Sequence, residues 1–293
     1  MLLIDPYNYY SNTMLIDTKL KKETSFQLNR PLYQLLEYKN HPTKSILLGD
    51  SRTNNLDVEI FKKYSHKEFT NLAYGGGSLP EIINTFWLVT KEHSLSEVYI
   101  GMNLTICNNY RSRDRVIEAE EIMKNFFSYA FSVYTFRSMH LILKTVLSGS
   151  HLKLGVPDSS KEKFWKYQLD VSAKDDYGLY EYPTDYIKDL IEISKYCKQN
   201  NIHLVFFIPP THTDLQKKVK EYNLQAIELK FKSDLKKMGD VYDFDFPSSI
   251  TENTNNFNDP YHFSPPIGEI IVKELFSGGS GEDVVFTKCD TYN

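Results

Sequence analysis

Short apolar segments that end at glycine or proline alternate with amphipathic helical patterns along most of this chain. Five such segments occur, at 45–48, 69–73, 98–100, 202–208 and 241–244. Most of them are continuously apolar, which is typical of strands buried on both faces of a parallel sheet. Helical patterns between them supply the crossovers that parallel strands need. We therefore predict an α/β fold with three layers, α/β/α, around a five-stranded parallel sheet.

The alternation stops between the third and fourth segments, over about 105–183. That stretch contains a long helical pattern, 116–147, followed by a polar part rich in Lys and Asp. We interpret it as a helical insertion in a domain that spans 44–276. Residues 1–43 are then an N-terminal extension. The run Ser277-Gly278-Gly279-Ser280-Gly281 begins a flexible tail, 277–293.

Composition excludes several classes of protein. Of the 293 residues, 41% are hydrophobic and 25% charged, as in an ordinary globular protein. The formal net charge of −4 gives no electrostatic footprint for a nucleic-acid partner. Cys107, Cys197 and Cys289 are far apart, so no disulfide framework or zinc spacing is indicated. The chain lacks the glycine pattern of a dinucleotide-binding loop, so we predict no cofactor. Because it also lacks zinc spacing, we predict no metal.

No apolar run is long enough to span a bilayer, which needs about 18 residues. The chain begins abruptly with apolar residues, Met1 to Ile4. We expect this start to follow a membrane anchor upstream.

Polar and glycine residues follow the predicted strands. The first strand is followed by Gly49-Asp50-Ser51-Arg52, the second by Gly75-Gly76-Gly77, the third by Gly101-Met102-Asn103, and the fifth by Asp259-Pro260-Tyr261-His262. Taken singly, each reads equally as a helix cap or a turn. Because the carboxyl ends of parallel strands share one edge of the sheet, we expect the four groups to lie close together.

These residue types suit acyl-transfer chemistry. A serine on a tight strand-to-helix turn is placed like a nucleophile, which suits Ser51. Asp259 and His262 can face each other across one turn. The carboxylate then holds Nδ1–H of the imidazole, which leaves Nε2 to accept a proton from a serine.

The order Ser, Gly, Asn, Asp-x-x-His resembles the four blocks of the SGNH (GDSL-type) hydrolase superfamily, over 44–276. The resemblance implies a flavodoxin-like fold and an ester hydrolase or acyltransferase with an acyl-serine intermediate. It implies Ser51 as nucleophile, His262 as general base and Asp259 as its orienter. It also implies an oxyanion hole formed by the backbone N–H groups of Ser51 and Gly76 and by the Asn103 amide. The glycine follows from the spacing Asn-x-x-x-x-Gly, which runs from Asn71 to Gly76.

Two positions depart from the family pattern, and both lie beside the implied site. Arg52 stands where an apolar residue is common, and Leu104 where Asp is usual. Neither removes a catalytic atom, but both indicate a divergent branch.

Four further segments resemble cell-envelope members of this superfamily, such as the alginate O-acetylation and D-alanyl-lipoteichoic-acid proteins. They are Ile4–Tyr7, Phe126–Leu147, Pro209–His212 and His262–Pro265. This similarity implies O-acyl esters, foremost O-acetyl esters, of an envelope or extracellular polysaccharide as substrate. It also implies an extracytoplasmic, bacterial location and a membrane O-acyltransferase as partner. Hydrolysis and transfer to a sugar hydroxyl both remain open.

Two residues keep alternative interpretations. Arg52 can pair with a carboxylate or phosphate on the substrate, or it can be structural. His212, which also follows a predicted strand, can contact substrate, act as another base, or be an ordinary surface histidine. A non-catalytic glycan-binding or scaffold partner of a membrane O-acyltransferase is the alternative function. The joint presence of Ser51, Asp259 and His262 argues against it.

Overall fold

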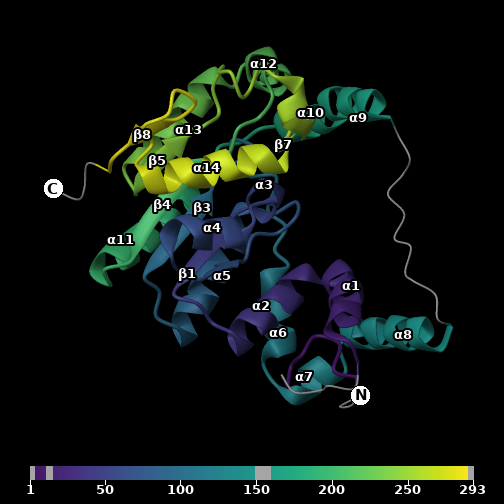
Figure 1. Ribbon diagram of the computed structural model, residues 1–293. Helices are drawn as coiled ribbons and strands as arrows, with labels where there is room; N and C mark the ends of the chain where they lie inside the picture. The colour runs from purple at the N-terminus through teal and green to yellow at the C-terminus, as the bar shows by residue number, and fades with distance from the viewer. Residues whose placement is uncertain (1–3, 11–15, 149–159, 290–293) are drawn as a thin grey trace. The chain divides into compact units, whose positions relative to one another are not determined.

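The computed structural model describes residues 4–10, 16–148 and 160–289 (Figure 1). It divides into two compact units. One combines Met1–Thr43 with Asp114–Asp158, and the other combines Lys44–Arg113 with Ser159–Asn293. The second unit contains the sheet. The two ends of the expected insertion, 105–113 and 160–183, therefore belong to the unit with the sheet, whereas its helical middle groups with the N-terminal residues.

The sheet has six strands in the order β2-β1-β3-β4-β5-β8. They are β1 (Ser45–Leu48), β2 (Phe69–Asn71), β3 (Glu97–Gly101), β4 (His203–Ile208), β5 (Asp240–Asp243) and β8 (Val285–Thr287). The first five are parallel, and β8 runs antiparallel to β5. The α/β prediction is confirmed, with a mostly parallel sheet.

The prediction of five strands is corrected to six. The sixth strand, β8, comes from the segment expected to be a flexible tail. It covers the edge that β5 would otherwise leave open, and Tyr242 pairs with Phe286 across the two strands. Their ring centroids are 4.6 Å apart, so ring packing reinforces the backbone pairing.

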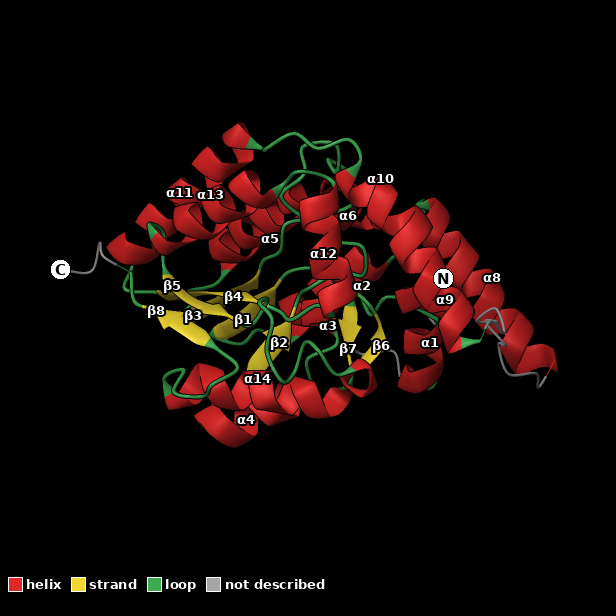
Figure 2. Ribbon diagram, turned by 90° about the horizontal axis from the view of Figure 1, so that it is seen from above, coloured by secondary structure: helices red, strands yellow, loops and turns green. Residues whose placement is uncertain are grey.

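Helices cover both faces of the sheet (Figure 2). One face carries α5 (Leu79–Glu92), α11 (Thr184–Gln199) and α13 (Gln225–Lys236), and the other carries α4 (Val58–Ser65) and α14 (Pro265–Ser277). The face under α4 and α14 is rich in aromatic side chains; Phe61 packs on Phe69 and Tyr99 at ring distances of 5.0 and 6.1 Å.

The chain between β4 and β5 forms two helices in succession, α12 (Thr213–Glu221) and α13. The chain breaks between them because Asn223 adopts a left-handed conformation, with φ of 58°.

Several short elements lie where the parallel strands end. The first is α3 (Ser51–Asn54), directly after β1. A hairpin of β6 (Phe257–Asp259) and β7 (His262–Phe263) follows the 3₁₀ turn η2 (Thr254–Asn256). The chain after residue 160 forms α9 (Lys161–Tyr167), the π-helical turn η1 (Gln168–Ser172) and α10 (Ala173–Tyr177).

The other unit is helical. It contains α1 (Thr18–Leu28), α2 (Arg30–Asn40), α6 (Val116–Met123), α7 (Phe126–Ala130) and α8 (Val133–Ser148). The long helical pattern at 116–147 is thus three helices. Asn125 interrupts it, because its side chain accepts a hydrogen bond from the Ser128 N–H and so caps α7.

The residues before α1 are held by side chains of the same unit. The Tyr129 hydroxyl donates to Asp5 Oδ1 at 2.6 Å and accepts from the Tyr7 N–H at 3.2 Å. Within the described ranges, no helix combines the length and the apolar character needed to cross a bilayer.

Candidate active site

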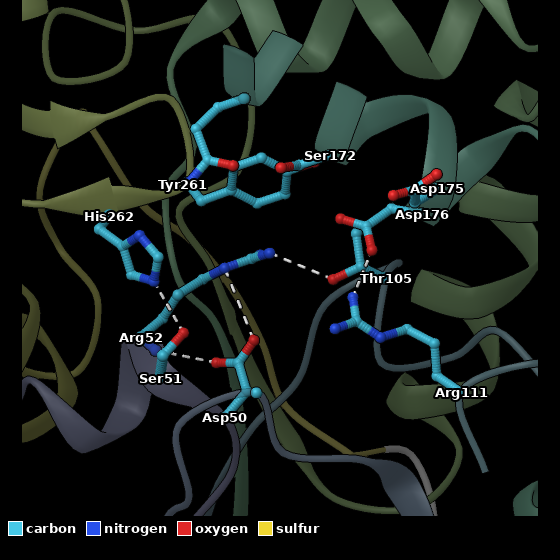
Figure 3. A pocket seen from close by; sticks show the side chains of 12 residues that line it. Asp50, Ser51, Arg52, Thr105, Arg111, Ser172, Asp175, Asp176, Tyr261 and His262 are labelled. Atoms are coloured by element: carbon cyan, nitrogen blue, oxygen red, sulfur yellow. Dashed lines mark hydrogen bonds and ion pairs between the residues drawn. The ribbon is translucent and has the colours of Figure 1, made fainter. Parts of the chain in front are cut away.

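The turn after β1 presents Ser51 to a cavity of about 500 Å³ (Figure 3). The chain leaves the strand at Leu48, passes Gly49 and Asp50, and enters α3 with Ser51 as its first residue. Asp50 caps this helix, since its Oδ1 accepts the Arg52 N–H at 2.9 Å. The serine side chain is therefore carried by a capped turn at the end of a buried strand.

His262 and Asp259 come from the small hairpin, where they are paired across β6 and β7. The Nε2 atom of His262 lies 2.7 Å from the Ser51 hydroxyl oxygen. Its Nδ1 atom lies 2.8 Å from Asp259 Oδ2 and 3.0 Å from Oδ1. The three side chains thus form a continuous hydrogen-bonded chain.

The carboxylate decides which imidazole nitrogen carries the proton. An ionised carboxylate only accepts hydrogen bonds, so the neutral His262 ring donates Nδ1–H to Asp259. Its Nε2 is then unprotonated and accepts the Ser51 O–H. This tautomer is the one that can take a proton from the serine as it attacks a carbonyl carbon.

Gly76 lines the same cavity as Ser51. Its φ of +61° lies in the left-handed region, which a side chain disfavours. In the described structure, the backbone N–H of Gly76 has no hydrogen-bond acceptor. An N–H in this position is available to a substrate oxygen beside Ser51.

Asn103 is 1% exposed and is not among the residues that line the cavity as the structure describes it. Its Nδ2 donates to Asp50 Oδ2 at 2.9 Å, and its Oδ1 accepts from the Thr105 hydroxyl at 2.6 Å. Thr105 in turn accepts from Arg52 Nη2 at 3.2 Å. The amide is therefore fixed by hydrogen bonds to Asp50 and, through Thr105, to Arg52, the two residues that flank Ser51.

Asn71, which the motif spacing paired with Gly76, stabilises the turn that carries Ser51. Its Nδ2 donates to the carbonyl oxygens of Thr53 and Leu56, at the end of α3. Gly101, at the end of β3, lets α3 pack closely on that strand, because a Cβ at this position would overlap the Thr53 hydroxyl.

Arg52 is only 3% exposed, yet it lines the cavity. Figure 3 shows its side chain between Ser51 and Thr105. Its Nε lies 3.7 Å from Asp50 Oδ2 and has no hydrogen-bond partner in the described structure. Burial by itself lowers the pKa of an arginine, but the acidic groups around it, Asp50 foremost, together outweigh burial and raise the pKa of Arg52 above its ordinary value. The guanidinium therefore stays charged inside the cavity.

Sequence reasoning missed most of the remaining lining. These residues come from the two ends of the expected insertion and from the hairpin: Thr105, Arg111, Gln168, Ser172, Asp175, Asp176 and Tyr261. Arg111 and Asp176 form an ion pair at 2.5 Å that joins the loop after β3 to α10. No short motif marks them, because they meet only when 105–111 packs beside 168–176.

Most side chains that line the cavity are polar or charged. Its described lining contains no aliphatic side chain and no phenylalanine, and besides the His262 imidazole it has one further ring, that of Tyr261. The Arg52 guanidinium carbon lies 5.5 Å from the centre of that ring. Such a wall offers many hydrogen-bond donors and acceptors.

His212 lies outside the Ser51 cavity. It caps α12, because its Nδ1 accepts the Asp214 N–H at 3.1 Å, and its Nε2 lies 3.3 Å from the Thr254 hydroxyl. It is 5% exposed and packs edge-on against Trp165, and burial lowers its pKa. It is not among the described residues that line the Ser51 cavity. The described residues also contain no group of three or more candidate metal ligands.

Several solved structures are similar to this chain. They include a GDSL-like lipase from Bacteroides thetaiotaomicron, with 10% identity, a TM-score of 0.44, and coverage of 85% of this chain and 98% of that chain. An acetylxylan esterase from Geobacillus stearothermophilus has 10% identity, a TM-score of 0.41, and coverage of 82% and 94%. A G-D-S-L family protein from Desulfitobacterium hafniense has 14% identity, a TM-score of 0.40, and coverage of 81% and 99%.

No protein-family model matches the chain, and no curated protein matches it.

Proposed function

We propose that this protein is a serine esterase or O-acyltransferase that acts on short O-acyl esters of a carbohydrate. The observation that carries the proposal is the hydrogen-bonded chain from Ser51 through His262 to Asp259, at the wall of a polar cavity. A serine hydroxyl in such a chain becomes a nucleophile when it is deprotonated by the histidine.

The reaction has two steps. Ser51 Oγ attacks the ester carbonyl carbon and passes its proton to His262 Nε2, and Asp259 stabilises the imidazolium that forms. The bond from carbon to the alcohol oxygen breaks, and that oxygen takes the proton from His262, which leaves an acyl-serine. Water or a sugar hydroxyl then attacks, with His262 again accepting the proton, and Ser51 is released.

The backbone N–H groups of Ser51 and Gly76 and the Asn103 amide are the proposed donors to the developing oxyanion. Loss of one such donor typically costs roughly 10² to 10³ in turnover. The hydrogen bonds from Asn103 to Asp50 and from Thr105 to Asn103 support this assignment, since they hold the amide close to the serine turn.

The lining favours a short acyl group. Burying a CH₂ group contributes about 0.8 kcal/mol only if apolar surface receives it, and the described lining has no aliphatic side chain. We therefore infer acetyl rather than a fatty acyl chain. Sugar hydroxyls, which donate and accept hydrogen bonds, suit the carboxylates, guanidinium groups and single tyrosine ring of the cavity.

Arg52 is a candidate substrate contact, next to the nucleophile. Its Nε–H has no hydrogen-bond acceptor among the described residues, although the group is buried. A substrate oxygen would satisfy this donor. His212 is buried as a helix cap outside the cavity, and we assign it no role in binding.

The cell-envelope polysaccharide, the extracytoplasmic location and the membrane O-acyltransferase partner rest on the resemblance of the motifs. We propose them together, because an acylated glycan and a membrane acyl donor meet at the envelope. Acetate release from crude envelope glycans, compared with acetylated xylan and chitooligosaccharides, tests the substrate. Activity confined to lipid esters would reject the polysaccharide and keep the esterase.

The first experiment tests the serine itself. Intact mass is measured after treatment with a fluorophosphonate, on the wild type, on Ser51→Ala and on Ser172→Ala. Ser172 lines the same cavity without contacting His262, so it is a matched control. We expect one adduct on the wild type and on Ser172→Ala, and none on Ser51→Ala. No adduct on folded wild type would favour a glycan-binding or scaffold role instead.

A further inference from the structure

Helix α8 buries two small polar side chains and one isoleucine, and it exposes several other large apolar side chains. Its buried residues are Thr135, Ser138 and Ile142. Phe136 and Leu147 are 46% and 84% exposed, although both are larger than the buried threonine and serine. An ordinary surface helix has the opposite arrangement, with its apolar stripe facing the core.

The exposed apolar residues form one stripe. Phe136, Leu143 and Leu147 are spaced i, i+7 and i+11, which places them on the same side of a helix. Phe127 and Phe131, at α7 and the turn before α8, are also strongly exposed. A set of exposed apolar side chains this close together in the chain marks an interaction surface.

A basic stripe runs beside the apolar one. Arg137, His140 and Lys144 are spaced i, i+3 and i+7, and α8 contains no acidic residue. None of the three has an ion-pair partner within the part of the chain that the structure describes. Glu118 and Glu121 of α6 share a hollow with Val133 and Tyr134 at the start of α8.

We propose that α8 binds the surface of an anionic lipid bilayer. In this arrangement Phe136, Leu143 and Leu147 enter the boundary between headgroups and acyl chains, and Arg137 and Lys144 contact lipid phosphates. Helices that lie on membranes combine a basic face with Phe and Leu in this way. The cores of protein–protein interfaces are instead depleted of lysine.

Helix length agrees with binding on the surface rather than insertion across it. At 1.5 Å per residue, the 16 residues of α8 extend about 24 Å. The hydrocarbon core of a bilayer is about 30 Å thick. The proposal is independent of the chemistry at Ser51, because α8 and the serine belong to different units.

The test is sedimentation of the full chain with vesicles of phosphatidylcholine alone or mixed with phosphatidylglycerol. We expect wild type to bind the anionic vesicles, less strongly as salt increases. Each basic side chain near an anionic surface contributes roughly fivefold, so Arg137→Gln with Lys144→Gln weakens binding about 25-fold. Phe136→Ser with Leu147→Ser weakens it at least about tenfold, because less apolar surface enters the bilayer.

Matched variants in the other unit serve as controls. Lys188→Gln with Lys195→Gln removes two exposed basic side chains from α11, and Leu229→Ser removes an exposed leucine from α13. Both should bind like wild type, and circular dichroism checks that every variant is folded. The proposal is overturned if wild type does not bind anionic vesicles, or if the control variants lose as much binding as the α8 variants. A dimer in light scattering that the α8 variants dissociate would also overturn it, since a second copy would then cover the stripe.

Discussion

The Asp259 carboxylate is held by three donors that fix its direction. The backbone N–H groups of Tyr261 and His262 lie 2.8 and 3.2 Å from its Oδ1, and His262 Nδ1 approaches both oxygens. This hydrogen bonding keeps the imidazole in one tautomer and one orientation. The proton route at the site therefore depends on a carboxylate that never contacts the serine.

Replacing Asp259 by Asn tests this dependence. The amide would donate to Nδ1, so the proton of the neutral imidazole would move to Nε2 and Ser51 would lose its acceptor. We expect kcat on p-nitrophenyl acetate to fall about 10⁴-fold. Asp185→Asn, an exposed aspartate on α11, should leave kcat unchanged. A small loss in a folded Asp259→Asn variant would mean that the histidine is not the base.

Thr105 is a positioning residue for the Asn103 amide. Thr105→Val removes both the hydroxyl that donates to Asn103 Oδ1 and the acceptor of Arg52 Nη2. We expect kcat to fall roughly tenfold, less than the loss of a whole oxyanion donor, with little change in KM. Thr105→Ser keeps the hydroxyl and should restore kcat. If serine fails to restore it, or if only stability changes, the residue acts through packing.

The buried His212 side chain caps the start of α12. The helix has unsatisfied N–H groups in its first turn, and the imidazole accepts one of them. An imidazole accepts only while it is neutral, and burial lowers the pKa of His212 accordingly. The cap is therefore lost when the ring is protonated.

Because the pKa of His212 is lowered in the folded chain, the stability of the fold decreases as pH falls. Unfolded chains protonate His212 near its ordinary value of 6.5, whereas the folded chain resists protonation. As pH falls below 6.5, the unfolded state binds more protons and stability decreases. His212→Asn keeps a capping acceptor and removes this titration.

Urea unfolding at about pH 7.5 and about pH 5.5 measures the effect. We expect the urea midpoint of wild type to fall more between these values than that of His212→Asn. His212→Ala should be less stable than His212→Asn at both, since it has no cap. Equal pH dependence in wild type and His212→Asn would contradict the assignment of a buried neutral cap.

The reacting groups and the proposed lipid-binding helix belong to different units of the molecule. Ser51, Asp259 and His262 all belong to the unit with the sheet. The helical unit has its own buried polar centre, in which the Tyr129 hydroxyl joins Asp5 and the Tyr7 N–H. Stability of one unit and chemistry of the other should therefore be separable.

Tyr129→Phe tests that separation. It removes one of the two donors to Asp5 Oδ1, which keeps the Tyr9 N–H, and leaves the buried Tyr7 N–H without its acceptor. We expect this to cost about 1–3 kcal/mol of the stability of the helical unit. Turnover of a small ester should stay at the wild-type level while the chain is folded. Tyr134→Phe, a partly exposed tyrosine on α8, should change stability by less than about 0.5 kcal/mol. Thermal unfolding and kcat are measured on the same samples.

Local sequence patterns predicted the parallel core of the fold and indicated the Ser51 turn and the Asp-x-x-His segment. Apolar strands, glycine turns and a carboxylate three residues before a histidine are local patterns, readable over a few residues. The alternation predicted which strands end at the same edge of the sheet. For the same reason it indicated where Ser51, Gly76 and His262 should be sought.

Other features follow from contacts that form only in the folded chain. Strand β8 forms because β5 offers an open edge, and the helical pattern at 116–147 breaks where Asn125 caps a new helix. The cavity wall needs residues 105–111 beside 168–176, a contact between segments distant in sequence. His212 looked available after β4, but η2 and Trp165 cover it. Burial and pairing over long distances in the chain leave no local pattern, which is why these features appear only in the folded molecule.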